Sequence, residues 1–309
     1  MAKAPTGGGP TAILFPGQGA QSVGMAGDWV EQSPSAGELF RRSSDMLGYD
    51  LLEVCRSGPA DRLNTTAVSQ PAILVTSLAA LEVQRARDAA TLDEAPITAG
   101  LSLGEYTSLV FAGALGFDDA LRIVAERGRA MQDCAAASPS GMVAVLGMER
   151  DAVTALCDAC RGNDVLEVAN VLCPGNIVIS GSIAACDRLA AAAEQAGAMK
   201  CLRLEVAGAF HTALMQPAVE RLTAAIARAT FHTPRIPVVS NVDARPHTDP
   251  DEIRSLLARQ VVGVVEWHAS VAYILSTGVR SIMEIGPGRV LRGLMKRIDR
   301  TVSASGVFD

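Results

Sequence analysis

Short apolar runs that alternate with helical patterns constrain the fold of this chain more than any other feature. The clearest runs are expected strands at Thr11–Phe15, Pro96–Ala99, Pro237–Ser240 and Ser281–Ile285. Helical periodicity occupies stretches after them, up to Val110 and over Asp118–Ala135, Leu214–Ala229 and Arg289–Arg300. Uninterrupted apolar strands that alternate with helices are typical of a parallel sheet covered on both faces. The sequence therefore predicts an α/β fold.

The middle of the chain follows a different order of expected elements. Strand, helix, strand, strand, helix and strand are expected at Met142–Leu146, Asp151–Cys160, Leu166–Asn170, Ile177–Ser180, Ile183–Ala196 and Lys200–Leu204. This order is the ferredoxin-like pattern. A chain of 309 residues is long enough for about two packed units. We therefore expect a small ferredoxin-like α+β subdomain at 138–205, inserted into a large α/β domain of residues 1–137 and 206–309.

Composition and charge exclude several classes of function. The chain carries 27 basic and 33 acidic residues, a net charge of −6, which disfavours nucleic-acid binding because that binding depends on neutralising phosphates. No apolar run reaches the roughly 18 residues of a membrane span, and the N-terminal segment lacks the apolar core of a secretory signal. We therefore expect no membrane association and a cytoplasmic protein, or one of an organelle stroma after removal of a transit peptide.

Neither the cysteines nor the N-terminal glycines form a recognisable ligand site. The seven cysteines lack the spacing of a disulfide framework, which indicates reduced thiols. Cys157 and Cys160 form a C-x2-C pair, but no second pair completes four zinc ligands, so we expect no metal. Gly7 to Gly9 lack the Gly-Lys-Ser/Thr that follows in a phosphate loop, and we interpret them as part of a flexible leader.

A serine between glycines is the candidate nucleophile. The segment Gly100-Leu-Ser-Leu-Gly104 fits G-x-S-x-G between an expected strand and an expected helix, where the serine occupies a sharp, exposed turn. Small neighbours leave the Ser102 hydroxyl accessible, and the N-terminus of the following helix favours an oxyanion. The alternative interpretation is a loop with ordinary glycines.

A serine nucleophile needs a base, and His211 fits best among the four histidines. It lies in a loop of small residues after the expected subdomain, whereas the other three lie among prolines, charges or surface-like helix residues. The alternative for His211 is a solvated loop residue.

Two further segments are candidates for the site. Phe15–Gln21 follows the first strand, where an open α/β sheet presents ligand-binding loops; the alternative is a simple turn. Arg127, near a helix end, is either functional or solvated.

Taken together, these segments resemble the malonyl-CoA:acyl carrier protein transacylases of fatty acid synthesis. The matching segments occur in the expected order, from about residue 11 to 300: Pro16–Gly19, Gly100–Glu105, Arg127-Gly with Met131-Gln132, Pro174–Asn176, Gly208–His211, Arg259-Gln260 and Glu284–Gly288. The resemblance implies a hydrolase-like parallel-sheet domain with a ferredoxin-like insertion. One departure is Leu101, because the family often has histidine immediately before the nucleophile.

The resemblance also implies a ping-pong reaction between malonyl-CoA and acyl carrier protein, with no bound cofactor and the coenzyme A thioester as substrate. Ser102 would attack the malonyl thioester while His211 accepts its proton, and the phosphopantetheine thiol of the carrier would then take the malonyl group. By the same resemblance, the backbone N–H groups of Gln18 and Leu103 form the oxyanion hole. A main-chain carbonyl near Gln260 orients the histidine.

The resemblance assigns the substrate pocket to a further set of residues. Arg127 would bind the free carboxylate of malonyl through two parallel hydrogen bonds, a geometry that lysine cannot supply. Leu101, Met131 and Phe210 would line the pocket, and Phe210 resembles the form of the family that selects malonyl.

Because acyl carrier proteins are strongly acidic, we expect a basic docking surface on the enzyme. Separately, we expect a monomer. One candidate for the docking surface is a helical stripe with spacings of 3, 4 and 4, formed by Arg289, Arg292, Lys296 and Arg300. A second candidate is the pair Lys200 and Arg203. Either would steer the carrier electrostatically, and the alternative for both is a solvated surface.

Other functions remain open at the level of sequence. A serine hydrolase or thioesterase would use the same serine, although such enzymes usually place an acidic residue between the serine and a late histidine. A non-catalytic scaffold that binds the carrier belongs to a different class. The sequence does not separate a carrier of fatty acid synthesis from one of polyketide synthesis.

Overall fold

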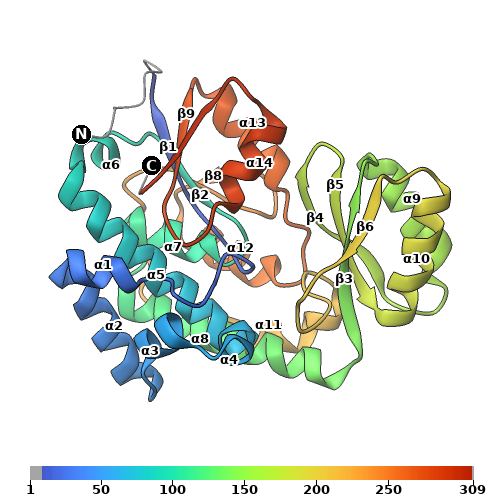
Figure 1. The fold of residues 1–309 in the computed structure, drawn as a ribbon, viewed down its shortest axis with the longest axis horizontal. Helices are drawn as coiled ribbons and strands as arrows, with labels where there is room; N and C mark the ends of the chain where they lie inside the picture. Colours follow the sequence, from blue (N-terminus) through green and yellow to red (C-terminus); the bar gives the residue numbers. More distant parts are fainter. Residues whose placement is uncertain (1–8, 308–309) are drawn as a thin grey trace.

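The computed structural model describes residues 9–307, so most of the expected leader lies outside the described residues. Two sheets form two lobes (Figure 1). The larger sheet has the order β10-β9-β1-β2-β7-β8. Its strands are β1 (Thr11–Phe15), β2 (Thr98–Gly100), β7 (Val238–Val239), β8 (Pro246–His247), β9 (Ser281–Glu284) and β10 (Ser303–Gly306). All pairs are parallel except β7 with β8. The predicted parallel sheet is therefore confirmed, and the antiparallel edge strand β8 was not predicted.

The alternation of side chains along β1 shows why this sheet needs helices on both faces. Ile13 and Phe15 belong to one apolar cluster, and Ala12 and Leu14 belong to a second. Successive side chains of a strand point to opposite faces, so both faces of β1 are covered. The strand is therefore apolar throughout, as the sequence indicated.

Helices of the large lobe fall into two groups on the two faces. The first cluster is built mainly by α1 (Gly27–Gln32), α2 (Pro34–Leu47), α3 (Leu51–Ser57), α4 (Ala60–Asn64), α5 (Thr66–Arg87), α6 (Ala89–Asp93), α7 (Gly104–Phe111), α8 (Phe117–Ala137), α11 (Gln216–Ala227) and α12 (Pro250–Gln260). The second cluster uses α13 (Trp267–Ser276) and α14 (Val290–Ile298). A 3-10 turn, Ala213–Met215, precedes α11.

Helix α5 is the one candidate among residues 9–307 with the length and hydropathy of a membrane span. Its apolar stretch is 83% buried inside the molecule, which accounts for its composition. It packs closely against α8, so its hydropathy reflects a position in the core.

The smaller lobe has its own antiparallel sheet and its own core. Its strands, in the order β4-β5-β3-β6, are β3 (Ser140–Leu146), β4 (Leu166–Cys173), β5 (Asn176–Ser182) and β6 (Lys200–Arg203). Helices α9 (Arg150–Arg161) and α10 (Ile183–Gln195) lie on the side away from the large lobe (Figure 1). Together these elements confirm the predicted ferredoxin-like α+β unit.

The cysteines of the C-x2-C pair belong to this core or its border. Cys157 is buried among the apolar side chains of the small lobe, and burial raises the pKa of its thiol to about 12. Cys160 is half-buried at the border of the same cluster. Within residues 9–307, no group of three or more His, Cys, Asp or Glu side chains is arranged to hold a metal ion.

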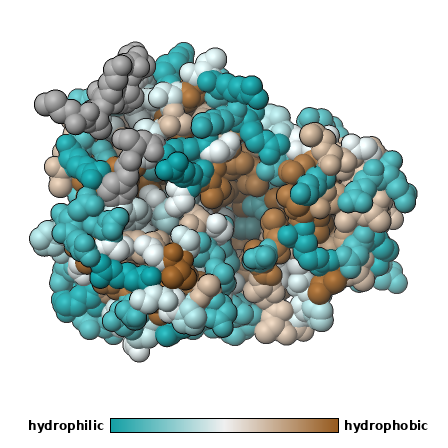
Figure 2. All heavy atoms as spheres, viewed as in Figure 1, coloured by the Kyte–Doolittle hydropathy of each residue, from teal (hydrophilic) through white to brown (hydrophobic). Residues whose placement is uncertain are grey.

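Backbone hydrogen bonds join the two lobes at the connection between α12 and α13. The Val171 amide donates to the Val265 carbonyl at 3.0 Å, and the Val265 amide donates to the Ala169 carbonyl at 2.8 Å. An ion pair of 2.8 Å joins Arg150 to Glu266 beside them. A hollow with apolar side chains on both walls lies between the lobes (Figure 2). The free face of the small sheet and the carboxyl edge of the large sheet therefore meet at a cleft.

Candidate active site

Ser102 lies at the turn between β2 and α7, at the edge of this cleft. Its φ of 48° is in the left-handed region, where a non-glycine residue is strained. A Cβ at Gly100 would collide with the backbone of Gly104, and a Cβ at Gly104 would collide with the Phe15 carbonyl. The two glycines of the motif are therefore required by close backbone packing, and this packing holds Ser102 in a sharp turn.

His211 meets Ser102 as the sequence predicted. Its Nε2 lies 2.9 Å from the Ser102 Oγ, and its Nδ1 lies 2.8 Å from the Gln260 carbonyl oxygen. Because a carbonyl can only accept, the proton of the neutral ring resides on Nδ1. Nε2 is thus left as an acceptor for the serine hydroxyl, the arrangement that a general base needs.

The buried position of His211 determines its charge. Burial and, after it, the nearby charge of Arg127 lower the pKa of His211 to about 4, although hydrogen bonding to the backbone at Gln260 and Gly263 opposes this fall. Protonating the ring would place a second cation in a water-poor site. The imidazole is therefore neutral at neutral pH.

Arg127 extends from α8 to the same serine and is almost completely buried. Its Nη1 donates to Gln70 Oε1 at 2.7 Å, and its Nη2 donates to Gln260 Oε1 at 3.0 Å and to Ser102 Oγ at 3.1 Å. All these acceptors are neutral, and no ion pair to Arg127 occurs among residues 9–307. Burial lowers the pKa of Arg127. A buried cation with only neutral acceptors is incompletely compensated, so the site favours an anionic group next to Ser102.

The two backbone N–H groups of the expected oxyanion hole lie in loops that contact each other beside the serine. Gln18 lies in the loop after β1, and Leu103 is the residue at the start of α7. Within the described part of the chain, neither amide donates a hydrogen bond to another protein group. The two loops touch closely, since a Cβ at Gly17 would collide with the Leu101 carbonyl. Glycine at this position brings the Gln18 amide close to the turn of Ser102.

A cavity of about 170 Å³ joins these groups. From the large lobe it is lined by Gln18, Leu101, Ser102, Arg127, Met131, Phe210, His211 and Val290, and from the small lobe and its connection by Met142, Asn170, Leu172, Val178, Leu204 and Val206. The structure thus brings together every predicted pocket residue. Gln260 and Leu103 are fully buried and do not line this cavity. The small-lobe wall was missed, because ordinary apolar strand residues give no local signal.

Three further buried polar residues support the site and were not predicted as site residues. Asn241 accepts from the Ser102 amide at 2.6 Å and donates to the Gly100 carbonyl at 2.7 Å. The Glu105 carboxylate accepts a hydrogen bond from the backbone N–H of Asn241, and the side-chain oxygen of Gln70 accepts one from Arg127. Burial raises the pKa of Glu105 to about 7, although hydrogen bonds from Asn241 and Gln260 oppose this rise. Available signals were the position of Glu105 directly after the serine motif and of Asn241 directly after a strand.

Helix α14 does not present the expected basic stripe as a whole. It spans Val290–Ile298, so Arg289 is its N-cap residue and Arg300 lies beyond its end. The side chain of Arg292 is only 14% exposed, because it pairs with the buried carboxylate of Glu284, 3.4 Å from its Nε. Arg289 and Lys296 are exposed. In the second candidate patch, Lys200 is exposed and Arg203 is paired with Asp187.

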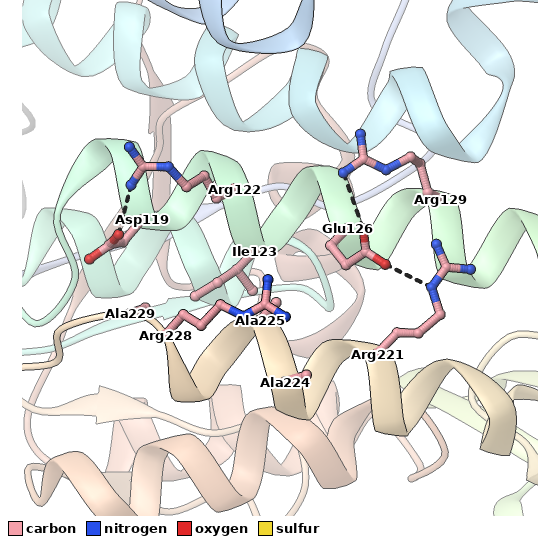
Figure 3. Close-up of a pocket in the computed structure, with 10 residues that line it drawn as sticks. All are labelled: Asp119, Arg122, Ile123, Glu126, Arg129, Arg221, Ala224, Ala225, Arg228 and Ala229. Atoms are coloured by element: carbon pink, nitrogen blue, oxygen red, sulfur yellow. Dashed lines mark hydrogen bonds and ion pairs between the residues drawn. The ribbon is translucent and has the colours of Figure 1, made fainter.

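The larger hollow between α8 and α11, of about 650 Å³, contains none of the predicted site residues. Four arginines face two carboxylates there (Figure 3). Glu126 bridges Arg129 and Arg221 at 3.1 and 2.7 Å, and Asp119 pairs with Arg122 at 2.9 Å. We interpret these residues as an exposed network of ion pairs that links α8 to α11. Such a network contributes modestly to the stability of the protein.

Comparisons with known proteins agree with this geometry. The family model described as acyl transferase domain matches residues 13–304. The malonyl CoA-acyl carrier protein transacylase of Escherichia coli (strain K12) is 41% identical over 297 residues, 96% of this chain and 95% of the relative. The solved malonyl CoA-acyl carrier protein transacylase of Coxiella burnetii has a TM-score of 0.92 and 35% identity, over 97% of this chain and 94% of the other.

A second similar structure contains a protein of this kind together with a carrier. It is described as a type II PKS acyl-carrier protein in complex with its malonyl-transacylase, and it matches with a TM-score of 0.92 and 37% identity, over 97% of this chain and 96% of the other. Family, identity and coverage all agree with the ordered segments of the sequence. The chain therefore belongs to the acyl transferase domain family, and within it to the malonyl-CoA:acyl carrier protein transacylases.

Proposed function

We propose that this acyltransferase moves the malonyl group from malonyl-CoA to the phosphopantetheine thiol of acyl carrier protein. The observation that carries the proposal is the guanidinium of Arg127, fixed 3.1 Å from the hydroxyl of Ser102 with neutral partners alone. An acyl group attached to Ser102 and carrying a carboxylate would pair with that charge. The names of the similar proteins support the same substrate and carrier.

The first half-reaction loads the serine. Ser102 gives its proton to Nε2 of His211, and its oxygen attacks the thioester carbonyl of malonyl-CoA. The amides of Gln18 and Leu103 stabilise the developing oxyanion, each donor contributing about 3–4 kcal/mol. The C–S bond then breaks, and coenzyme A leaves with the proton from the imidazole. Malonyl remains on the serine as an ester.

The second half-reaction reverses these roles with a different thiol. The phosphopantetheine thiol of the carrier gives its proton to His211 and attacks the malonyl ester. The C–O bond breaks, and Ser102 recovers the proton. Protein groups handle each proton and each developing charge, so the proposed chemistry uses coenzyme A only as part of the substrate and needs no bound cofactor.

We expect the acidic limb of the pH profile to lie well below the pKa of an exposed histidine. His211 must be neutral to accept a proton, and its pKa is lowered to about 4. The kcat/KM for malonyl-CoA should therefore stay nearly constant as pH falls from 8 to about 5, and then decline. An unperturbed imidazole would already be half protonated at about pH 6.5. Stopped-assay kinetics should be measured across this pH range, with circular dichroism to confirm folding at each pH. A loss of half the kcat/KM near pH 6.5 would contradict the proposal.

A hydrolase or thioesterase is disfavoured by the orientation of His211. Such enzymes usually orient the histidine with an acidic side chain, whereas here the main-chain carbonyl of Gln260 does so. We further propose a carrier of fatty acid synthesis. A polyketide carrier is the second candidate, favoured by the similar structure that contains one. Transfer rates to purified carriers of both kinds would decide between them, and rapid malonyl-CoA hydrolysis without any carrier would contradict transfer as the function.

We propose that the carrier docks beside α14. Val290 lines the cavity and is 37% exposed, so its neighbour Arg289 lies near the mouth, and Lys296 is exposed two turns further on. Charge reversal of both residues to glutamate should raise the KM for the acidic carrier about fivefold, with a weaker salt dependence. The KM for malonyl-CoA should not change. The matched control is Lys200→Glu; an equal effect of that variant, or no effect at Arg289 and Lys296, would contradict this docking site.

Three further expectations concern the state of the protein. We propose a monomer, because one chain supplies all the residues of the site, and a location in the cytoplasm, which the bacterial origin of the similar proteins supports. We also propose the division into 1–137 with 206–309 and 138–205. The separate apolar core of the small lobe supports this division.

A further inference from the structure

Gln260 forms four hydrogen bonds at the centre of the site. Its Nε2 donates to Glu105 Oε2 at 2.7 Å and to the Ser102 carbonyl at 3.0 Å. Its Oε1 accepts from Arg127, and its own carbonyl oxygen accepts from His211. One residue therefore contacts both the base and the guanidinium, and its amide can satisfy these partners in one orientation only.

Glu105 determines that orientation. If the amide of Gln260 turned over, its oxygen would face two acceptors, Glu105 Oε2 and the Ser102 carbonyl. Its NH2 group would face the guanidinium of Arg127, which has only donors. No ion pair joins Glu105 directly to Arg127 in the described part of the chain, so the carboxylate acts on the guanidinium through the amide between them. Glu105 is 3% exposed and Gln260 is fully buried, so water does not compete for these bonds.

We propose that Glu105 is a positioning residue: it holds the Gln260 amide so that Arg127 stays aligned beside Ser102, and it thereby sets the preference of the serine for a malonyl over an acetyl group. The inference rests on the proposed role of Arg127 toward the substrate carboxylate. Glu105 does not touch the substrate. Its loss therefore weakens selection of the acyl group more than it weakens acyl transfer itself.

Two conservative variants separate the effect of side-chain length at position 105 from the effect of its charge. Glu105→Gln removes the charge, but its amide oxygen can still accept from Asn241 and Gln260. Glu105→Asp keeps the charge, but the side chain is one methylene shorter and withdraws from Gln260. The ratio of kcat/KM for malonyl-CoA to that for acetyl-CoA should stay within about twofold of the wild type in Glu105→Gln, and should fall about tenfold in Glu105→Asp, mainly through a higher KM for malonyl-CoA.

A control variant, and the same substitution made in a second variant, test whether the effect is only general disruption of the active site. Asn241→Ser disturbs the same buried cluster through the Ser102 turn without contacting Arg127, and it should lower transfer of both acyl groups equally. In a Gln260→Ala background, Glu105→Asp should cause no further loss of selectivity, because the amide through which Glu105 acts is gone.

The results expected and the results that overturn the inference are distinct. An unchanged ratio in Glu105→Asp, a tenfold fall in Glu105→Gln, or an additive effect in the Gln260→Ala background would each overturn it. Failure of the proposed function is separate, because the wild-type enzyme would then show no preference for malonyl-CoA before any variant is compared.

Discussion

Replacing Ser102 by alanine is expected to abolish transfer, with a fall in kcat of about 10⁴-fold or more. The Ser102 Oγ is the atom that we propose forms the acyl ester, and the turn Gly100–Gly104 that presents it holds no second nucleophilic side chain for His211 Nε2. Alanine also has a Cβ, so the strained backbone at φ 48° changes little and the protein should fold. The loss should therefore be chemical rather than structural.

Intact mass spectrometry measures this prediction directly. Wild-type protein mixed with malonyl-CoA should gain one malonyl group, and peptide mapping should place it on Ser102. The alanine variant should gain none, while its thermal unfolding stays close to that of the wild type. A malonyl adduct that maps elsewhere, or transfer that survives in a folded Ser102→Ala protein, would disprove the acyl-serine mechanism.

Replacing Arg127 by methionine is expected to change which acyl group the enzyme accepts. Methionine keeps an unbranched side chain of similar reach but offers the malonyl carboxylate no charge and no donor. Truncating one partner of a buried, hydrogen-bonded charge pair costs about 2–5 kcal/mol. The kcat/KM for malonyl-CoA should accordingly fall about 10²–10³-fold. Acetyl-CoA has no carboxylate, so its use should stay the same or rise.

Arg127→Lys is the matched control for geometry. Lysine retains a positive charge but cannot form two parallel hydrogen bonds with a carboxylate. It should recover only part of the malonyl activity lost in Arg127→Met. Melting temperatures are needed alongside, since Gln70 Oε1 and Gln260 Oε1 both lose their guanidinium donor in either variant. Equal losses for malonyl-CoA and acetyl-CoA would show that Arg127 supports the site generally and does not select the substrate.

The neutral state of His211 follows from the same burial that supports the proposed selectivity of Arg127. Both side chains approach one hydroxyl, and both are almost completely buried. Low local polarity strengthens the attraction between the guanidinium and a substrate carboxylate, and it keeps the neighbouring imidazole unprotonated. Burial of the two groups therefore supports both the proposed acyl-group selection and the proposed proton transfer.

The sequence by itself determined the elements and pointed to the candidate nucleophile. Runs of apolar residues, either alternating with polar ones or uninterrupted, predict strands from local sequence alone. The glycines around Ser102 predict a tight turn that only small residues allow. The ferredoxin-like order and the ordered segments of the family were also visible, because they depend on residues that are close in the chain. His211 was singled out among four histidines by its loop of small residues.

Only the tertiary structure decided how distant residues converge. Gln18, Ser102 and Asn241 each follow a strand, and parallel strands place these three ends at one edge of the sheet. The bonds that hold the site, such as those from Gln260 to Glu105 and from Asn241 to Ser102, join residues 155 and 139 positions apart. Periodicity reports which face a side chain takes within its own element. It carries no information on which other element that face will meet, because strand order and lobe packing set those contacts.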